Sequence, residues 1–263
     1  MILHSLVSGI DEAGRGSVFG PLFIVGVTLD LKSLNFLVKK GLKDSKLFSG
    51  QAGQRKRSDL ALKIQEIATE LEIVEIKASE IEKTLRNRPN DNLNLLEIRY
   101  ISKIVLQITS TNMTIDTLSS PKYTKNQLII QLNKLEKSLK IQNEINKVDS
   151  CRFNLIKNVD SRKEVIIAKK ADKIFPIVSA ASCIAKHLRD QKLRKIEEEY
   201  GLPQSILGKG YPNEKDRNVM KFLEEYKKEI ISKEFPFIRY SWSWSPLQDL
   251  IKASYKTLDS FFK

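Results

Sequence analysis

Short apolar segments alternate with longer amphipathic ones along the first two thirds of the chain. Residues 6–10 have the pattern of a short strand, and the near-continuous apolar run at 21–29 is typical of a strand buried on both faces. Between them, residues 13–20 include three glycines and predict a turn. We expect three further strands, at residues 71–78, 113–117 and 165–168.

Helical periodicity is clearest at residues 93–109, where aliphatic side chains recur on one face. Residues 54–70 and the segment from Ile177 onward also predict helices. Ser79 and Glu82 have the spacing of a capping box, which predicts that a short helix follows.

The character of the chain changes after residue 190, where charged residues become dense. We expect two amphipathic helices there, at residues 191–200 and 213–231, with a loop at 208–212 between them. Strands therefore come first and helices last. This order predicts an α/β body followed by a helical C-terminal region.

The composition indicates a globular protein with a polyanionic partner. About 41% of residues are hydrophobic, and 45 Lys and Arg against 32 Asp and Glu give a formal charge of +13. Residues 122–163 alone carry ten basic and four acidic residues. A surface of this kind favours nucleic acid, because Lys and Arg release the counterions condensed on phosphates. General basicity that aids solubility is the alternative.

Few residues are available for soft metal sites. The two cysteines, Cys151 and Cys183, are far apart and have no CxxC spacing, so we expect packed thiols in a reducing compartment. Only His4 and His187 could supply imidazole. The N-terminus lacks a signal-peptide pattern, and no apolar run approaches the ~20 residues of a membrane span, so we expect a cytoplasmic location.

Four acidic residues share one kind of position. Asp11 and Glu12 follow the first predicted strand, Asp116 lies at the end of the fourth, and Asp172 follows the fifth. Ligand sites of α/β sheets collect at strand ends. Carboxylates that meet there would repel one another unless Mg²⁺ or Mn²⁺ lies between them, and two such ions about 4 Å apart can hydrolyse a phosphodiester. Taken singly, Asp116 or Asp172 could be an ordinary turn or cap residue.

Several motifs, in this order, resemble the ribonuclease HII family. Residues 9–16, GIDEAGRG, continued by Gly20-Pro21-Leu22, are similar to the opening signature of that family. The other matching elements are residues 44–46, 92–97, 115–116, 168–182, 185–190 and 208–212, and Arg239 with Trp242. The resemblance runs from about residue 8 to residue 244 and is closer to archaeal members than to bacterial ones.

The resemblance implies a set of active-site acids and metals. Asp11, Glu12, Asp116 and Asp172 would be the catalytic and metal-binding residues. The first three would bind metal in the free enzyme, and Asp172 would complete a second Mg²⁺ or Mn²⁺ site with substrate.

It also implies substrate contacts. Gly14, Arg15 and Gly16 would form the loop that senses the ribonucleotide 2′-hydroxyl, Tyr211 would lie on the sugar at the RNA–DNA junction, and Lys46 would touch a phosphate. Without the family match, the glycine loop could be only a turn, Tyr211 a packed aromatic and Lys46 a solvated lysine.

The chain departs from the family pattern at two places. Ser17 stands where the family usually has proline, a change that we expect to loosen the loop without removing a functional group. Residues 133–163, rich in Lys and Asn, predict a lineage-specific surface extension.

The C-terminal tail carries a separate short motif. Leu258, Phe261 and Phe262 fall on one side of a helical turn and resemble the motif that docks on the sliding clamp, PCNA, with Tyr255 replacing the usual glutamine. A C-terminal helix that packs on the body is the alternative.

The resemblance implies an RNase H-like fold with a mixed five-stranded sheet flanked by helices. We expect a catalytic domain at 1–190, a helical domain at 191–250, a tail at 251–263, and substrate in a basic groove between body and C-terminal part. The implied monomeric enzyme cuts RNA/DNA hybrids and DNA containing ribonucleotides, on the 5′ side of a ribonucleotide, by two-metal hydrolysis that leaves a 3′-hydroxyl and a 5′-phosphate. The alternatives are a non-catalytic nucleic-acid-binding module and another nuclease of the same fold.

Overall fold

The computed structural model describes residues 6–42, 50–87, 91–157 and 162–261, with the backbone alone for residue 51 and residues 254–261. The chain forms two compact units. The sheet unit comprises Met1–Ala13, Phe23–Val74 and Leu93–His187, and the second unit comprises Gly14–Leu22, Glu75–Asn92 and Leu188–Lys263. The predicted domain boundaries at residues 190 and 250 remain predictions.

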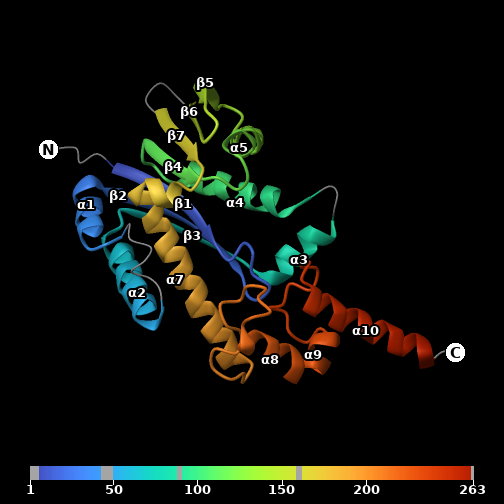
Figure 1. Cartoon of the computed structure of the whole chain (residues 1–263). Helices are drawn as coiled ribbons and strands as arrows, with labels where there is room; N and C mark the ends of the chain where they lie inside the picture. The colour runs from blue at the N-terminus through green and yellow to red at the C-terminus, as the bar shows by residue number, and fades with distance from the viewer. Residues whose placement is uncertain (1–5, 43–49, 88–90, 158–161, 262–263) are drawn as a thin grey trace. The chain divides into compact units, whose positions relative to one another are not determined.

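One mixed sheet organises the first unit (Figure 1). Its order is β3-β2-β1-β4-β7-β6-β5, and β4 pairs in parallel with both β1 and β7, while the pairs β1–β2, β6–β7 and β5–β6 are antiparallel. The strands are β1 Leu6–Ala13, β2 Leu22–Asp30, β3 Glu70–Ile76, β4 Asn112–Asp116, β5 Lys140–Asn146, β6 Ser150–Ile156 and β7 Arg162–Ala168. The α/β class is confirmed.

The predicted count of five strands is wrong, because β5 and β6 lie in the segment that we expected to be a surface extension. In β6 the buried apolar side chains Cys151, Phe153 and Leu155 alternate with two polar residues, the exposed Arg152 and the buried Asn154. This two-residue period is a strand signal that the Lys/Asn-rich composition concealed. The side chains of β5 are mostly exposed, so that strand has no buried face to reveal it.

Helices connect or follow the strands of the sheet unit. They are α1 Leu31–Lys39, α2 Gly50–Ile67, α4 Leu93–Gln107, α5 Pro121–Leu135, α6 Ala171–Ile174 and the beginning of α7 Pro176–Glu199. Helix α5 was not predicted, because Ser120-Pro121 at its start is also typical of a turn. The hydroxyl of Ser120 accepts a hydrogen bond from the Tyr123 amide at 3.2 Å, and Pro121 occupies the first helical position.

Two glycines let helices approach the sheet closely. A side-chain carbon on Gly26 of β2 would lie 2.4 Å from Cγ2 of Ile104 in α4, and one on Gly9 of β1 would lie 2.5 Å from the carbonyl oxygen of Ile177 in α7. Gly26 pairs with Ile10, the neighbour of Gly9, and neighbouring side chains point to opposite faces. Helix α4 therefore covers one face of the sheet, and the first turn of α7 covers the other.

The second unit is helical and has an aromatic core. It holds α3 Ala78–Arg86, the rest of α7, α8 Arg217–Glu225, α9 Lys227–Ile231 and α10 Ser245–Phe261. Phe222 is fully buried, and its ring centroid lies 5.2 Å from that of Phe19. The predicted helix at 191–200 is part of α7, and the predicted helix at 213–231 is divided at Tyr226. No described helix is long and apolar enough to cross a membrane.

The predicted capping box at Ser79 is wrong. Helix α3 begins at Ala78, so Ser79 lies within its first turn, and the preceding residue Lys77 makes no side-chain cap. The Glu82 carboxylate is buried and instead accepts hydrogen bonds from the amide and hydroxyl of Ser241, at 2.9 and 2.7 Å. A partner 159 residues away outweighs the local capping pattern.

Candidate active site and nucleic-acid interface

The first acidic pair lies within β1 and not after it. The strand continues to Ala13, with Asp11 opposite Val25 and Glu12 opposite Ile24 on β2, so the predicted strand end at Ile10 is wrong. Among the described residues, however, pairing of β1 with β4 ends at Ile10–Ile115. Asp11 and Asp116 are therefore the next residues of two neighbouring parallel strands, and they lie where the pairing of these strands ends.

Asp11 is a buried acid among like charges, with 6% of its surface exposed. Burial raises its pKa well above the ordinary value, and the charges of Glu12 and Asp116 raise it further. The Ser182 hydroxyl and the Lys186 ammonium group, both on α7, act in the opposite direction. Asp11 shares its face of β1 with Gly9, the face that α7 covers, so one helix provides both compensating groups.

Asp116 ends β4 and is held by backbone amides. Its Oδ1 accepts hydrogen bonds from the amides of Thr117 and Ala171, both at 2.9 Å. Lys170, with a left-handed φ of 56°, turns the chain after β7 into α6, where Asp172 lies. Partial burial raises the pKa of Asp116, the amides lower it, and the charge of Asp172 raises it again. The four predicted acids are thus linked by charge, Glu12 and Asp116 to Asp11 and Asp172 to Asp116.

These carboxylates suit a divalent cation in their chemistry. Among the residues that the structure describes, no three His, Cys, Asp or Glu side chains are already grouped as ligands of one ion. Burial raises the pKa values of Asp11 and Asp116, and the charges of neighbouring acids raise them further, so a cation between the carboxylates would favour their ionised forms. A donor set made only of oxygen fits Mg²⁺ or Mn²⁺.

The loop that follows the acidic pair belongs to the second unit and is tightly bonded there. The amide of Ser17 donates to the Gly14 carbonyl at 3.1 Å, which closes a turn with Arg15 and Gly16 at its tip. Arg239 is completely buried, and its guanidinium group donates to the Arg15 carbonyl at 2.9 Å and to the Gly20 carbonyl at 3.1 and 3.2 Å. One buried cation therefore holds both sides of the loop.

Tyr211 faces the tip of this loop. A side-chain carbon on Gly16 would lie 3.6 Å from the Tyr211 ring, an ordinary van der Waals distance, so Gly16 lies directly beside the aromatic side chain. The guanidinium carbon of Arg189 lies 4.3 Å from the ring centroid, at cation–π distance. Tyr211 keeps 40% of its surface exposed, whereas Arg189 keeps only 4%. The arrangement offers an accessible aromatic face supported by a buried cation.

Some predicted site residues, or their side chains, lie outside the part of the chain that the structure describes. Lys46 and Phe262 lie outside the described residues, and the side chains of Leu258 and Phe261 in α10 also lie outside them.

Sequence reasoning assigned no role to the α7 residues Ser182, Lys186 and Arg189. Their signal was available, because they recur at intervals of four and three residues and thus share one face of a helix.

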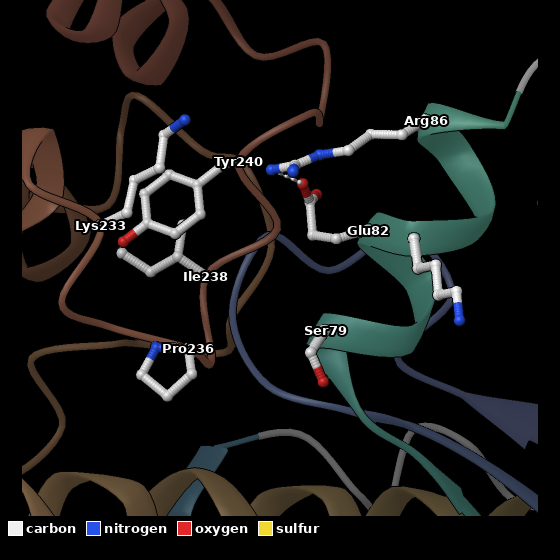
Figure 2. A pocket seen from close by; sticks show the side chains of 8 residues that line it. Ser79, Glu82, Arg86, Lys233, Pro236, Ile238 and Tyr240 are labelled. Carbon is white, nitrogen blue, oxygen red and sulfur yellow. Dashed lines mark ion pairs between the residues drawn. The ribbon is translucent and has the colours of Figure 1, made fainter.

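A separate pocket of about 350 Å³ opens in the second unit (Figure 2). Arg86 and Glu82 approach each other on its α3 side, where Nη2 of Arg86 lies 3.5 Å from Oε2 of Glu82, and Lys233, Ile238 and Tyr240 line the other side. Among the described residues, none of the predicted site residues lines this pocket, and its one carboxylate is already engaged with Arg86 and Ser241.

Comparison with known proteins identifies the family. The family model described as Ribonuclease HII matches residues 8–244. The chain belongs to the ribonuclease HII family. The ribonuclease HII of Pyrococcus furiosus is 35% identical over 262 residues, covering 98% of each chain. This family member is accordingly a type 2 ribonuclease H, an endonuclease with a nucleic-acid substrate.

Solved structures agree with the fold. The crystal structure of ribonuclease H2 from Pyrococcus horikoshii OT3 is similar with a TM-score of 0.68 and 27% identity, covering 94% of this chain and 98% of that one. The ribonuclease HII of Archaeoglobus fulgidus, solved in a complex with PCNA, has a TM-score of 0.65 and 24% identity, covering 90% of this chain and 95% of that one, and shows the shared fold.

Proposed function

We propose that this ribonuclease HII cuts the RNA strand of RNA/DNA hybrids and also cuts duplex DNA on the 5′ side of an embedded ribonucleotide. The products would carry a 3′-hydroxyl and a 5′-phosphate. The observation that carries the proposal is that the charges of Glu12 and Asp116 act on Asp11, and the charge of Asp172 acts on Asp116, in a protein of formal charge +13. Repelling carboxylates are unfavourable next to phosphate, so a hydrolytic role with cations explains their presence better than binding alone.

The four acids would hold two divalent ions, Mg²⁺ or Mn²⁺, when substrate is bound. Such ions supply an activated water and stabilise the leaving oxygen of the phosphodiester. Residues of α7 would support metal binding by the acids. Lys186 lies close enough to Asp11 to oppose the rise of its pKa, so it would help keep this buried carboxylate ionised and ready to bind.

The second unit would supply ribonucleotide recognition. The 2′-hydroxyl distinguishes RNA from DNA, and the backbone at Gly14, Arg15 and Gly16 has no bulky side chain at either glycine to hinder its approach. Tyr211 would pack on the sugar at the RNA–DNA junction, and Lys46 would contact a phosphate. The buried guanidinium group of Arg189 would keep the Tyr211 ring in place.

One cleavage assay separates this proposal from the two alternatives. Duplex DNA with one ribonucleotide is incubated with the protein and Mg²⁺ beside an all-DNA duplex and a long RNA/DNA hybrid. We expect a single cut 5′ to the ribonucleotide and no cut in the all-DNA control. Binding without cleavage would favour the non-catalytic module, and cleavage of both duplexes would favour another nuclease of the same fold.

We also propose that the C-terminal tail binds a sliding clamp through Leu258, Phe261 and Phe262. The motif resemblance supports this, as does a fold neighbour that was solved as a complex with PCNA. Calorimetry of the full chain with the cognate clamp should show binding that the double substitution Phe261→Ala and Phe262→Ala removes. Equal binding by both proteins would reject the proposal.

A further inference from the structure

The carbonyl oxygen of Gly210 receives an unusual number of hydrogen bonds from the loop that carries Arg15. The amides of Val18 and Phe19 donate to it at 2.7 and 3.1 Å, and the Ser17 hydroxyl donates to it at 2.6 Å. The same hydroxyl lies 2.8 Å from the Phe19 carbonyl. Three donors from three consecutive residues therefore meet at one acceptor on a segment almost 200 residues away.

The position of this carbonyl determines the position of Tyr211. The Gly210 carbonyl and the Tyr211 amide belong to one planar peptide group, so fixing the oxygen fixes the plane from which Tyr211 projects. Gly210 itself has a φ of +73°, and an added side-chain carbon would lie 2.6 Å from the Ser17 hydroxyl. The backbone at Gly210 thus fits directly against Ser17.

Ser17 is bonded in two directions. Its amide closes the Gly14 turn, and its hydroxyl reaches Gly210, the residue before Tyr211. The side chain is completely buried. Our expectation that serine in place of proline loosens the loop stays a prediction, but the hydroxyl adds a link that a proline side chain lacks.

We infer that Ser17 is a positioning residue that sets the spacing between the Gly14–Gly16 turn and Tyr211, and so adjusts how this enzyme recognises a ribonucleotide. The inference rests on the proposed function of the turn and of Tyr211. Ser17 itself touches no reacting atom. Its hydroxyl acts through the Gly210 peptide, so its loss should affect the step that needs both parts aligned more than it affects folding.

The test compares Ser17→Ala with Ser102→Ala. Ser102 is also completely buried, and its hydroxyl donates to the Ile98 carbonyl at 2.7 Å, but it lies in α4 of the sheet unit. Both substitutions remove one buried hydroxyl-to-carbonyl hydrogen bond. Gly210 would still accept bonds from Val18 and Phe19, so the Ser17→Ala protein should fold, and urea unfolding would check that the two variants have similar stability.

Steady-state cleavage with Mg²⁺ is measured on duplex DNA with one ribonucleotide and on a long RNA/DNA hybrid. For Ser17→Ala we expect kcat on the single ribonucleotide to fall about tenfold with little change in KM, because misalignment of a positioned group affects the chemical step. The ratio of kcat on the two substrates should change by a similar factor. Ser102→Ala should keep the wild-type ratio.

The outcomes separate the inference from the proposed function. If the wild type cuts at the ribonucleotide and Ser17→Ala keeps the ratio of Ser102→Ala within about twofold, the inference is wrong and the proposed function stands. If the wild type does not cut there, both are wrong. Should Ser17→Ala not fold, Ser17→Cys, which retains a weak donor, replaces it, with an expected loss of about threefold and the same criterion for rejection.

Discussion

Arg239 offers a direct test of how the second unit is held together. Its guanidinium group is completely buried and donates three hydrogen bonds, two to the Gly20 carbonyl and one to the Arg15 carbonyl. It also lies 5.5 Å from the Trp242 ring centroid. Replacing Arg239 by Met keeps an unbranched side chain of similar reach and removes all of these bonds.

The expected loss follows from the acceptors that remain. The Gly20 and Arg15 carbonyls would lose their guanidinium donors, and an unsatisfied buried polar group costs about 1–3 kcal/mol. Removal of a buried charge offsets part of this, because the cation no longer has to be desolvated. We therefore expect unfolding free energy to fall by about 3 kcal/mol, which corresponds to a fall in Tm of roughly 6–12 °C for a chain of this size.

Urea unfolding of the wild type and Arg239→Met measures this difference, provided that the m-value is unchanged. Arg86→Met is the matched control in the same unit. The Arg86 side chain is 64% exposed and, among the described residues, makes one ion pair, of 3.5 Å with Glu82, so its loss should change stability by less than about 1 kcal/mol. If Arg239→Met and Arg86→Met are equally stable, the buried guanidinium group does not organise the loop.

Three further predictions concern a packed glycine, the two cysteines and Tyr211. Gly9→Ala should lower the free energy of unfolding in urea by about 1–3 kcal/mol, because the new carbon would lie 2.5 Å from the Ile177 carbonyl oxygen. The control Gly201→Ala has nothing within 4 Å and should cost only about 1 kcal/mol for its left-handed backbone. A larger loss for Gly201→Ala than for Gly9→Ala would contradict the close packing at Gly9. Cys183 and Cys151 should resist a thiol reagent at pH 8 in the native protein and react in urea, because both are buried and burial raises the pKa of Cys183 to about 12. Rapid labelling of the native protein would contradict this prediction. Tyr211→Ala should reduce cleavage at a single ribonucleotide by about ten- to a hundredfold, because aromatic stacking is lost. Thermal stability should change little, because 40% of Tyr211 is exposed, and unchanged cleavage would show that Tyr211 does not contact the substrate.

The central part of the sheet was predictable because its hydrophobic pattern is local. The continuous apolar run of β2 and the helical face of α4 identify these elements without knowledge of their partners. Exposed β5 lacks such a pattern, and the start of α5 was hidden because Ser120-Pro121 is equally typical of a turn. Elements whose side chains are mostly exposed, or whose first residues also suit a turn, could therefore be identified only from the structure.

The candidate site was predictable as a set of residue types and not as a geometry. Family resemblance located Asp11, Glu12 and Tyr211 by number. The bonds from Ser17 to Gly210 and from Arg239 to Arg15 join residues about 200 positions apart, and no local pattern encodes such pairs. The helical spacing of Ser182 and Lys186 was visible in the sequence, but their compensating role required the observation that α7 covers the face of β1 that carries Asp11.

We propose that the buried acid of β1 serves metal-dependent hydrolysis, and the substitution Asp11→Asn tests this claim. Cleavage and binding are measured on duplex DNA with one ribonucleotide in Mg²⁺, beside Glu66→Gln, which makes the same charge change at a surface position 67% exposed. We predict that Asp11→Asn loses cleavage by on the order of a thousandfold or more while binding changes little, and that Glu66→Gln cleaves like the wild type. Near-normal turnover by Asp11→Asn would contradict the claim.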